Sequence, residues 1–213
     1  MAELNKPFPR IFSRAARQYL YPILPAALAL AFFSGFSLTA LGAESTTPRI
    51  ELPGLSTSSR PNEVNTLADD DYFPTLINLI QNSNRSIDLA MFVFKTSTKG
   101  DNRPMQIAKA LIAARQRGVR VRVILEKSGY DEKLNQTNEE VGALLKENRI
   151  VVEFDSPQRT NHAKLVVIDS RYCLVGSHNF TQAALKHNHE LSLLIDSRTL
   201  ARELLDYMGK ISR

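Results

Sequence analysis

Apolar residues recur along the chain with two different spacings, and these spacings predict where helices and strands lie. Helical spacing, with apolar positions three and four apart, is clearest from Phe73 to Ile80 and again from Ile107 to Ile112. Unbroken apolar runs of strand length alternate with these segments. The predicted strands are 86–94, 119–125, 149–154, 163–168, 172–175 and 190–195.

Capping residues and helix breakers place the ends of the predicted helices. Three acidic residues at 69–71 suit the start of the first helix, Pro104 suits the first turn of the second, and Gly118 suits its end. Thr137 and Glu140 form a candidate capping box for a third helix. Because strands and helices alternate, one α/β layered domain is predicted. The last two predicted helices are a short one over about 181–186 and a terminal one with Leu200, Leu204, Tyr207 and Met208 inward.

The first 43 residues have the pattern of an export signal or a membrane anchor. Residues 19–43 carry no charged side chain, follow four basic residues and end in a cluster of small residues. A signal peptide cleaved after Ala40 or Ala43 is the favoured interpretation, and a retained anchor through 19–43 is the alternative. Because the basic flank stays inside, both predict an exported protein, either periplasmic or secreted, or anchored in the inner membrane and facing outward.

Composition and charge refine the domain boundaries more than they refine the function. Residues 44–68 are rich in Ser, Thr, Pro and Asn, which predicts a linker with a candidate edge strand at 49–52 and a folded domain over 69–213. The formal net charge is +5, but residues 44–213 hold 23 basic and 21 acidic side chains. Charge alone therefore does not indicate a nucleic-acid partner. The one cysteine, Cys173, lies in an apolar run and is predicted to be a core residue.

The residues with the clearest chemistry lie in the segment 161–181. His162 and Lys164 are two positions apart, so on a strand their side chains point to the same face. An imidazole can attack phosphorus and later leave, and a lysine can neutralise the non-bridging oxygens of a phosphodiester. Ser177 and Asn179 could donate hydrogen bonds to the same oxygens. The pattern therefore predicts a site for a phosphodiester.

A hairpin is predicted to bring the two halves of this pattern together. The turn at 169–171 reverses the chain, and pairing of Ile168 with Tyr172 sets the register. The same register gives the further pairs His162 with His178 and Lys164 with Gly176, and puts Ser177 and Asn179 beside them.

The spacing H-x-K-x4-D-x6-G-S-x-N, from His162 to Asn179, resembles the signature of the phospholipase D superfamily. The order of strands and helices from Asp69 to the C-terminus is also similar to that fold. The resemblance implies a single phospholipase D-like α/β domain whose mixed, mostly parallel β-sheet is flanked by helices on both faces. It also implies a covalent phosphohistidine route that needs no cofactor.

The resemblance implies a role for each matching residue. Glu190, at the start of the next strand, matches the acid that holds the nucleophilic imidazole in its working tautomer, and a solvated glutamate is the alternative. Asp169 completes the signature, but the strand carries it roughly 23 Å from His162, so we expect it to cap the turn or pair with a nearby base. The remaining implied roles are nucleophile for His162, phosphate ligand for Lys164, and phosphate binding for Ser177 and Asn179.

Among the four histidines, only His162 is followed by a lysine two residues on, so the chain carries one copy of the motif. Two-copy members pair their motifs within one chain, which implies that this chain forms a homodimer with a shared active site. His178 is the alternative second imidazole within a single chain.

Three functions remain open for a chain of this kind. One motif copy, a short chain and an export signal resemble the small bacterial exported endonucleases of the superfamily, so a nucleic-acid substrate, DNA or RNA, is expected first. A phospholipase D that hydrolyses phospholipid head groups is the alternative. An exported binding module with an inactive site is the third interpretation, disfavoured because every chemical residue of the motif is present.

Two further sets of residues could bind ligands, but each has a simpler interpretation. His187 and His189 form an H-x-H pair that could hold zinc, yet no cysteine partner is available and we expect no metal. The basic residues at 115–122 are interpreted as a solvated helix end and strand, with a contact to a phosphate backbone as the alternative. These basic residues are Arg115, Arg117, Arg120 and Arg122.

Overall fold

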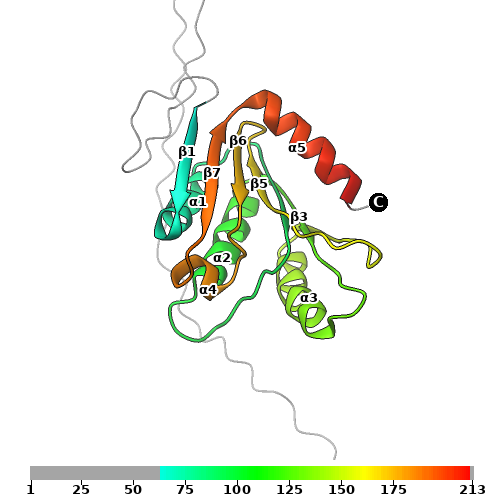
Figure 1. Cartoon of the computed structure of the whole chain (residues 1–213). Coiled ribbons are helices and arrows are strands. Elements are labelled where there is room, and N and C mark those ends of the chain that lie inside the picture. Colours follow the sequence, from blue (N-terminus) through cyan, green and yellow to red (C-terminus); the bar gives the residue numbers. More distant parts are fainter. Residues whose placement is uncertain (1–62, 212–213) are drawn as a thin grey trace, which may run out of the picture. The chain divides into compact units, whose positions relative to one another are not determined.

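The computed structural model describes residues 63–211, which form a seven-stranded mixed sheet with helices on both faces (Figure 1). The predicted signal or anchor segment and the candidate edge strand at 49–52 lie outside the described residues. Among residues 63–211, no helix combines the length and apolar character needed to cross a bilayer. The elements in chain order are β1 (Val64–Ala68), the 3-10 turn η1 (Asp69–Asp71), α1 (Tyr72–Gln81), β2 (Ser86–Met91), α2 (Arg103–Gln116), β3 (Arg120–Leu125), α3 (Glu132–Glu147), β4 (Val151–Phe154), β5 (Lys164–Ile168), β6 (Tyr172–Gly176), α4 (Gln182–Lys186), β7 (Leu191–Asp196) and α5 (Arg198–Ile211).

The strands lie in the order β1-β7-β6-β5-β2-β3-β4, and the sheet is mixed as predicted. Only the β2–β3 and β3–β4 pairs are parallel, whereas the other four described pairs are antiparallel. The expectation of a mostly parallel sheet is therefore wrong. The lengths of some connections explain part of this: α2 and α3 supply the long crossovers that parallel pairs need, whereas the tight turn between β5 and β6 requires antiparallel neighbours.

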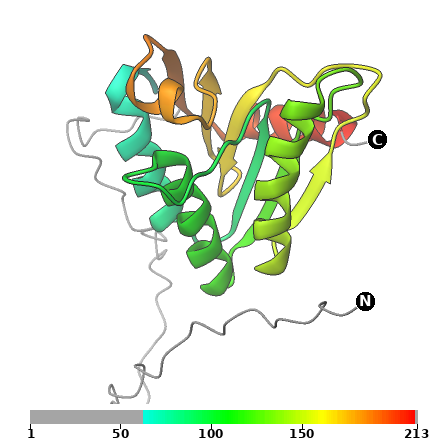
Figure 2. The ribbon, with the colours of Figure 1, turned by 90° about the horizontal axis from the view of Figure 1, so that it is seen from below.

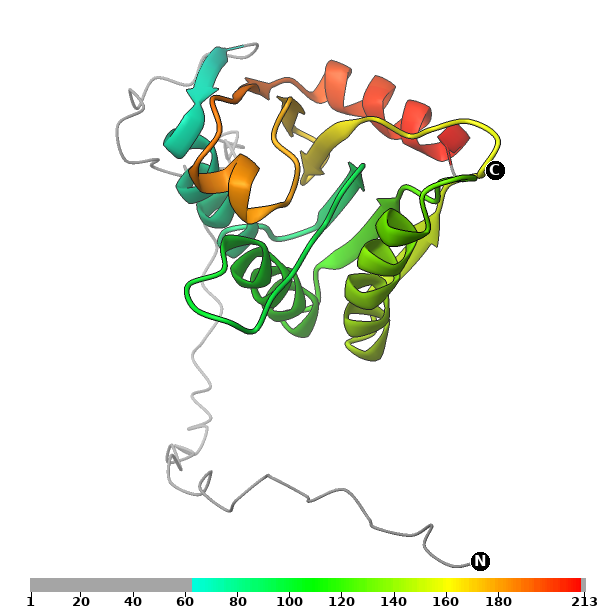
Figure 3. The same ribbon diagram turned by 60° about the horizontal axis from the view of Figure 1, so that its bottom comes forward.

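Helices cover both faces of the sheet, as the resemblance implied. Figures 2 and 3 show α1, α2 and α3 on one face and α5 alone on the other. Two clusters of buried side chains match these layers, one under α1, α2 and α3 and a smaller one under α5. Cys173 lies in the smaller cluster with no exposed surface, and burial raises the pKa of its thiol to about 11. The cysteine is therefore a core residue, as predicted.

Two predicted boundaries differ from the structure. Strand β1 falls inside the predicted linker, because Val64–Ala68 pairs antiparallel with β7 at the edge of the sheet. The strand was missed because Leu67 is its one buried residue, so it shows no apolar alternation. Helix α3 starts at Glu132 with Asp131 as its N-cap, so Thr137 lies inside the helix and its hydroxyl donates to the carbonyl of Lys133. The predicted capping box at Thr137 is therefore wrong.

Helix α5 has one residue of its predicted inner face pointing outward. Met208 is fully buried, together with Ala201, whereas Tyr207 is 51% exposed. The buried stripe follows positions three and four apart through Ala201, Leu204, Leu205 and Met208, and Tyr207 lies beside it.

Asp169 lies in the β5–β6 hairpin turn, and its carboxylate bonds to a neighbouring loop. Asp169 and Ser170 both have positive φ, as the tight turn after Ile168 requires. The Asp169 carboxylate accepts hydrogen bonds from the backbone N–H groups of Asn84 (3.0 Å), Arg85 (2.8 Å) and Ser86 (3.0 Å). Asp169 therefore fixes the loop between α1 and β2, at the edge of the sheet away from Lys164.

Asp169→Asn should lower stability while leaving the chemical step intact in the molecules that remain folded. The amide keeps one acceptor oxygen, but its N–H₂ group would face N–H donors, so we expect a loss of about 2–4 kcal/mol in the free energy of unfolding. Urea unfolding measures this loss, and Asp206→Asn, an exposed substitution on α5, is the matched control. A stable variant without activity would contradict this structural role.

Candidate active site

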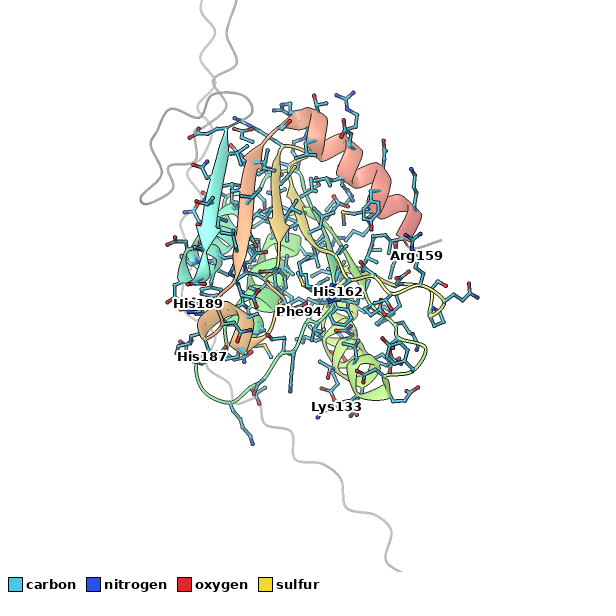
Figure 4. The ribbon with its side chains drawn as sticks, in the orientation of Figure 1. Phe94, Lys133, Arg159, His162, His187 and His189 are labelled. Carbon is cyan, nitrogen blue, oxygen red and sulfur yellow. The ribbon has the colours of Figure 1, made fainter. Side chains whose placement is uncertain are left out.

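The candidate catalytic residues His162 and Lys164 lie at the edge of the sheet where the parallel strands end. Lys164 starts β5 opposite Met91 of β2, Met91 is level with Leu125 of β3, and Leu125 is level with Phe154 of β4. The carboxyl ends of β2, β3 and β4 therefore meet the start of β5 at a common edge. Loops at the carboxyl ends of parallel strands are the usual place for ligands in α/β sheets. His162, labelled in Figure 4, precedes β5 at this edge.

His162 is exposed and stands against an aromatic ring. The centroids of the His162 and Phe92 rings are 4.5 Å apart, with an angle of 55° between their planes. Partial burial and the positive charge of Lys164 lower the pKa of His162 below its usual range. A neutral imidazole at pH 7 has a free lone pair, so the geometry suits a nucleophile.

Lys164 lies beneath the same ring and is 7% exposed. Its Nζ lies 4.9 Å from the Phe92 ring centroid and donates to the His162 carbonyl oxygen at 2.8 Å. Burial lowers the pKa of Lys164, and the negative charge of Glu190 partly opposes this shift. The sequence pattern missed Phe92, although it stands directly after a fully buried strand, where a parallel sheet presents its ligands.

The second half of the motif reaches the site through the continuation of β2. Phe180 N–H donates to the Val93 carbonyl (3.0 Å), and Lys95 N–H donates to the Phe180 carbonyl (2.8 Å). The rings of Phe94 and Phe180 pack edge to face with centroids 5.0 Å apart. Asn179 therefore lies next to the segment that carries Phe92. Its Oδ1 is buried and accepts no hydrogen bond from the described residues.

Ser177 and Glu190 form one polar unit near Lys164. The Ser177 hydroxyl donates to Glu190 Oε2 and accepts from Leu191 N–H at 3.1 Å. Glu190 Oε1 also accepts from the Asn188 side chain at 3.1 Å. Within the described chain the Glu190 carboxylate is not bonded to His162, so a role in orienting an imidazole stays a prediction.

His178 does not lie opposite His162, contrary to the extrapolated register. It is fully buried, its ring stacks on Tyr72 at 4.2 Å, and its two nitrogens lie 2.8 Å from Ser192 Oγ and 3.2 Å from the Asp69 carbonyl oxygen. His178 is therefore a structural residue, not a second catalytic imidazole within one chain.

The predicted register itself is correct for Ile168 and Tyr172, but the ladder between β5 and β6 ends at Leu165 and Val175. Beyond that point β5 stays with β2, and β6 stays with β7. Gly176 lets β6 approach β7 closely, because a Cβ there would lie 2.2 Å from Ser192 Oγ and 2.5 Å from the Leu191 carbonyl oxygen.

The histidine pair and the basic run are the other residues that the sequence offered as ligands. The described residues contain no group of three His, Cys, Asp or Glu side chains placed to bind a metal ion. His189 Nδ1 lies 3.1 Å from Asp69 Oδ2, and His187 is exposed on the segment after α4 (Figure 4). Arg120 and Arg122 both bond to Asp88, which is 1% exposed. The basic run is thus engaged within the fold, which gives no support to the predicted alternative of a phosphate-backbone contact.

The chain resembles several proteins of known name. Residues 76–211 match the family model described as cardiolipin synthase, PLD-like domain. A Rickettsia felis protein named phospholipase D is 37% identical over 99 residues, which cover 46% of this chain and 47% of that protein. The mitochondrial cardiolipin hydrolase of Xenopus tropicalis is 29% identical over 133 residues, or 62% of this chain and 57% of that protein. The chain thus spans about half the length of the curated relatives it matches.

Solved structures agree on the fold. Nuc from Salmonella typhimurium, a phospholipase D family member, has a TM-score of 0.60 at 23% identity, covering 70% of this chain and 93% of that one. NucT from Helicobacter pylori has a TM-score of 0.54 at 21% identity, covering 70% and 96%. At these identities the likeness concerns the fold. Since the family model matches more than half of the chain and the signature runs from His162 to Asn179, the protein belongs to the phospholipase D superfamily.

Proposed function

We propose that the protein hydrolyses phosphodiesters through a covalent phosphohistidine. The observation that carries this proposal is the pairing of an exposed His162, whose lowered pKa favours the neutral ring, with the buried ammonium of Lys164. His162 attacks phosphorus, the bond to the leaving oxygen breaks, and a second imidazole donates a proton to that oxygen. The same imidazole then takes a proton from water, which displaces His162 and releases a phosphomonoester. Lys164 stabilises the charge that develops on the phosphoryl oxygens.

Nucleic acid is the substrate we propose first. Exposed basic side chains, Lys95, Lys99 and Arg159, lie on the loops that follow β2 and β4. Tyr130, on the loop after β3, is 85% exposed. Cations that neutralise a phosphate backbone and an aromatic ring that can stack on a base are the usual parts of a single-strand binding surface.

Phospholipid is the second candidate, and two specific observations favour it. The curated relatives are named phospholipase D and mitochondrial cardiolipin hydrolase. In addition, Val175 (37% exposed) and Leu191 (55% exposed) flank Ser177 and Glu190, so apolar surface borders the site. Such a rim could contact acyl chains or a second copy of the protein.

We also propose a homodimer with one shared active site. The chemistry needs two imidazoles, and the described part of the chain supplies one exposed motif histidine, since His178 is buried with both nitrogens engaged. On the face of β1, β6 and β7 that carries Val175 and Leu191, Val64 is also exposed (57%). An apolar sheet face next to the site suits an isologous contact. Export to the periplasm or beyond, directed by residues 19–43, belongs to the same proposal.

The proposed hydrolase should not need a divalent metal, because Lys164 supplies the positive charge that a metal would otherwise bring. Purified residues 44–213 with EDTA should cleave one of three substrates offered side by side, DNA, RNA or phosphatidyl lipid vesicles. Cleavage of DNA or RNA supports the first substrate class, and cleavage of lipid replaces it with the second. Complete loss of activity in EDTA that zinc restores would overturn metal independence, and inertness toward all three substrates with and without metals would overturn the proposed function.

A further inference from the structure

His162 lies near the end of the loop that connects β4 to β5 across the sheet. Strand β4 lies at the edge of the sheet, and the chain must pass β3 and β2 before it enters β5. Residues 155–163 make this crossing with no regular secondary structure of their own. Figure 4 shows Arg159 on this loop and His162 where the loop reaches the sheet. The position of the proposed nucleophile therefore depends on whatever fixes the crossing loop.

Two buried carboxyl groups lie at the start and in the path of this loop. Glu126 follows the last residue of β3 and is 1% exposed, and Asp155 follows the last residue of β4 and is 8% exposed. The two residues are neighbours across the β3–β4 pair, since Leu125 pairs with Phe154 and the Asp155 N–H donates to the Leu125 carbonyl oxygen at 2.9 Å. The backbone N–H of Asn161 donates to Glu126 Oε2 at 2.6 Å, and that of Ser156 donates to Asp155 Oδ1 at 2.6 Å. The pair thus holds both ends of the crossing, one residue before His162.

Hydrogen bonds from Asn138 hold the backbone at Glu126 in place. Asn138 of α3 is fully buried, and its Nδ2 donates to the carbonyls of Glu126 (2.9 Å) and Phe92 (2.9 Å). Its Oδ1 accepts from Phe94 N–H at 3.0 Å. One buried amide therefore joins the strand end that carries Glu126 to the segment whose ring packs on His162.

Two adjacent buried carboxyl groups cannot both be charged without a large penalty, because desolvation and mutual repulsion add together. Burial raises the pKa of Glu126, and the charge of Asp155 adds to this shift; burial also raises the pKa of Asp155, against the opposing effect of N–H donors and of Arg159. The other charged neighbours are Glu153, on the same face of β4, and Lys127, which pairs with Glu139 on α3 at 2.8 Å. Helix α5 contributes Leu204 and Met208 to the apolar cluster on this face of the sheet.

We propose that Glu126 and Asp155 share one proton, carried by Glu126 and accepted by Asp155, and that this acid pair is the positioning device for His162. Neither residue touches the phosphodiester in this scheme. The part that concerns His162 rests on the proposed function, because it assumes that His162 is the nucleophile. The pair makes the geometry of the site dependent on pH through groups other than the catalytic ones.

The shared proton gives stability a definite dependence on pH. The unfolded chain loses both carboxyl protons near their usual pKa values of 4.5 and 3.8, whereas the folded chain keeps one until its raised pKa. The folded state binds more protons across that window, so the free energy of unfolding falls as pH rises through it and stays lower above it. Once the second proton is lost, repulsion between the carboxylates should loosen the loop and displace His162.

Glu126→Gln tests the pair, because an amide mimics the protonated carboxyl. Its Nε2 can donate to Asp155 and its Oε1 can accept from Asn161 N–H. We expect the variant to keep at least about half of wild-type kcat and to lack most of the fall in melting temperature that wild type shows between pH 4.5 and the raised pKa. Glu126→Ala should lose both bonds and lower kcat by about 10–100-fold with little change in KM, since misplacement of a reacting group by about 1 Å has effects of this size. Glu147→Gln, at an exposed acidic residue near the end of α3, is the control.

The inference is overturned if wild type and Glu126→Gln show the same dependence of melting temperature on pH, if Glu126→Gln is as damaged as Glu126→Ala, or if Glu126→Ala keeps wild-type kcat. The melting measurements need no substrate. A wild-type protein that hydrolyses nothing but still differs from Glu126→Gln in its melting profile would therefore count against the proposed function while supporting the shared proton.

Discussion

His162→Asn should reduce turnover by about 10⁴-fold or more while leaving the melting temperature nearly unchanged. The other histidine within the motif segment, His178, cannot replace it as the nucleophile, because His178 is buried and bonded at both nitrogens. The imidazole of His162 is exposed, so its removal costs little packing. Rates under saturating substrate and thermal melts of the same samples measure the two effects.

The matched control is His187→Asn, which removes an exposed imidazole from the segment after α4 and should keep full activity. Lys164→Met extends the test, since methionine can keep the packing under Phe92 while removing the ammonium. We expect it to lower kcat by about 10²–10³-fold. If well-folded His162→Asn hydrolyses phosphodiesters at the wild-type rate, the assignment of the nucleophile is wrong.

The turn and the first pairs of the β5–β6 hairpin could be predicted from sequence, because they depend on local signals. Asp169 and Ser170 mark the turn, and the apolar runs on either side fix Ile168 against Tyr172. The same reasoning placed Asp169 far from His162 and expected it to cap the turn or pair with a base, whereas its carboxylate accepts from three backbone N–H groups of the loop before β2.

The predicted β5–β6 register is wrong beyond Leu165 and Val175, where the outer neighbours of the two strands hold them apart. His162 and His178 would face each other only if β5 and β6 stayed together, but β2 holds Lys164 and β7 holds Gly176. A register extrapolated from a hairpin takes account of its two strands but not of the strands that pair with them on the outer sides. The expectation of a mostly parallel sheet failed for a related reason, since the direction of β5 and β7 depends on which strands they join in space.

The parts of the site that the motif missed are supplied by long-range contacts. Phe92, Glu126 and Asp155 each stand directly after a strand of the parallel half of the sheet, far in sequence from His162. A usable signal was present: a charged or aromatic residue that follows an apolar strand in a strand–helix–strand unit lies at the edge where ligands bind. That signal gives a position, whereas the contacts of Asn161 with Glu126 could come only from the fold.

Mixing His162→Asn subunits in excess with wild-type chains should inhibit the wild-type enzyme. In a shared site each histidine of the pair has a separate task, attack on phosphorus or protonation of the leaving oxygen, so a mixed dimer lacks one of them. With about a ninefold excess of variant and random exchange, only about one wild-type chain in ten finds a wild-type partner, and activity per wild-type chain should fall about tenfold. Subunits are exchanged by mild denaturation and dilution, and light scattering confirms the dimer.

Adding the same excess of His187→Asn, which keeps the motif histidine, should increase activity instead. If activity stays proportional to the amount of wild-type chain, or if a proven monomer is fully active, each chain works alone, and the second proton donor must be sought outside the motif.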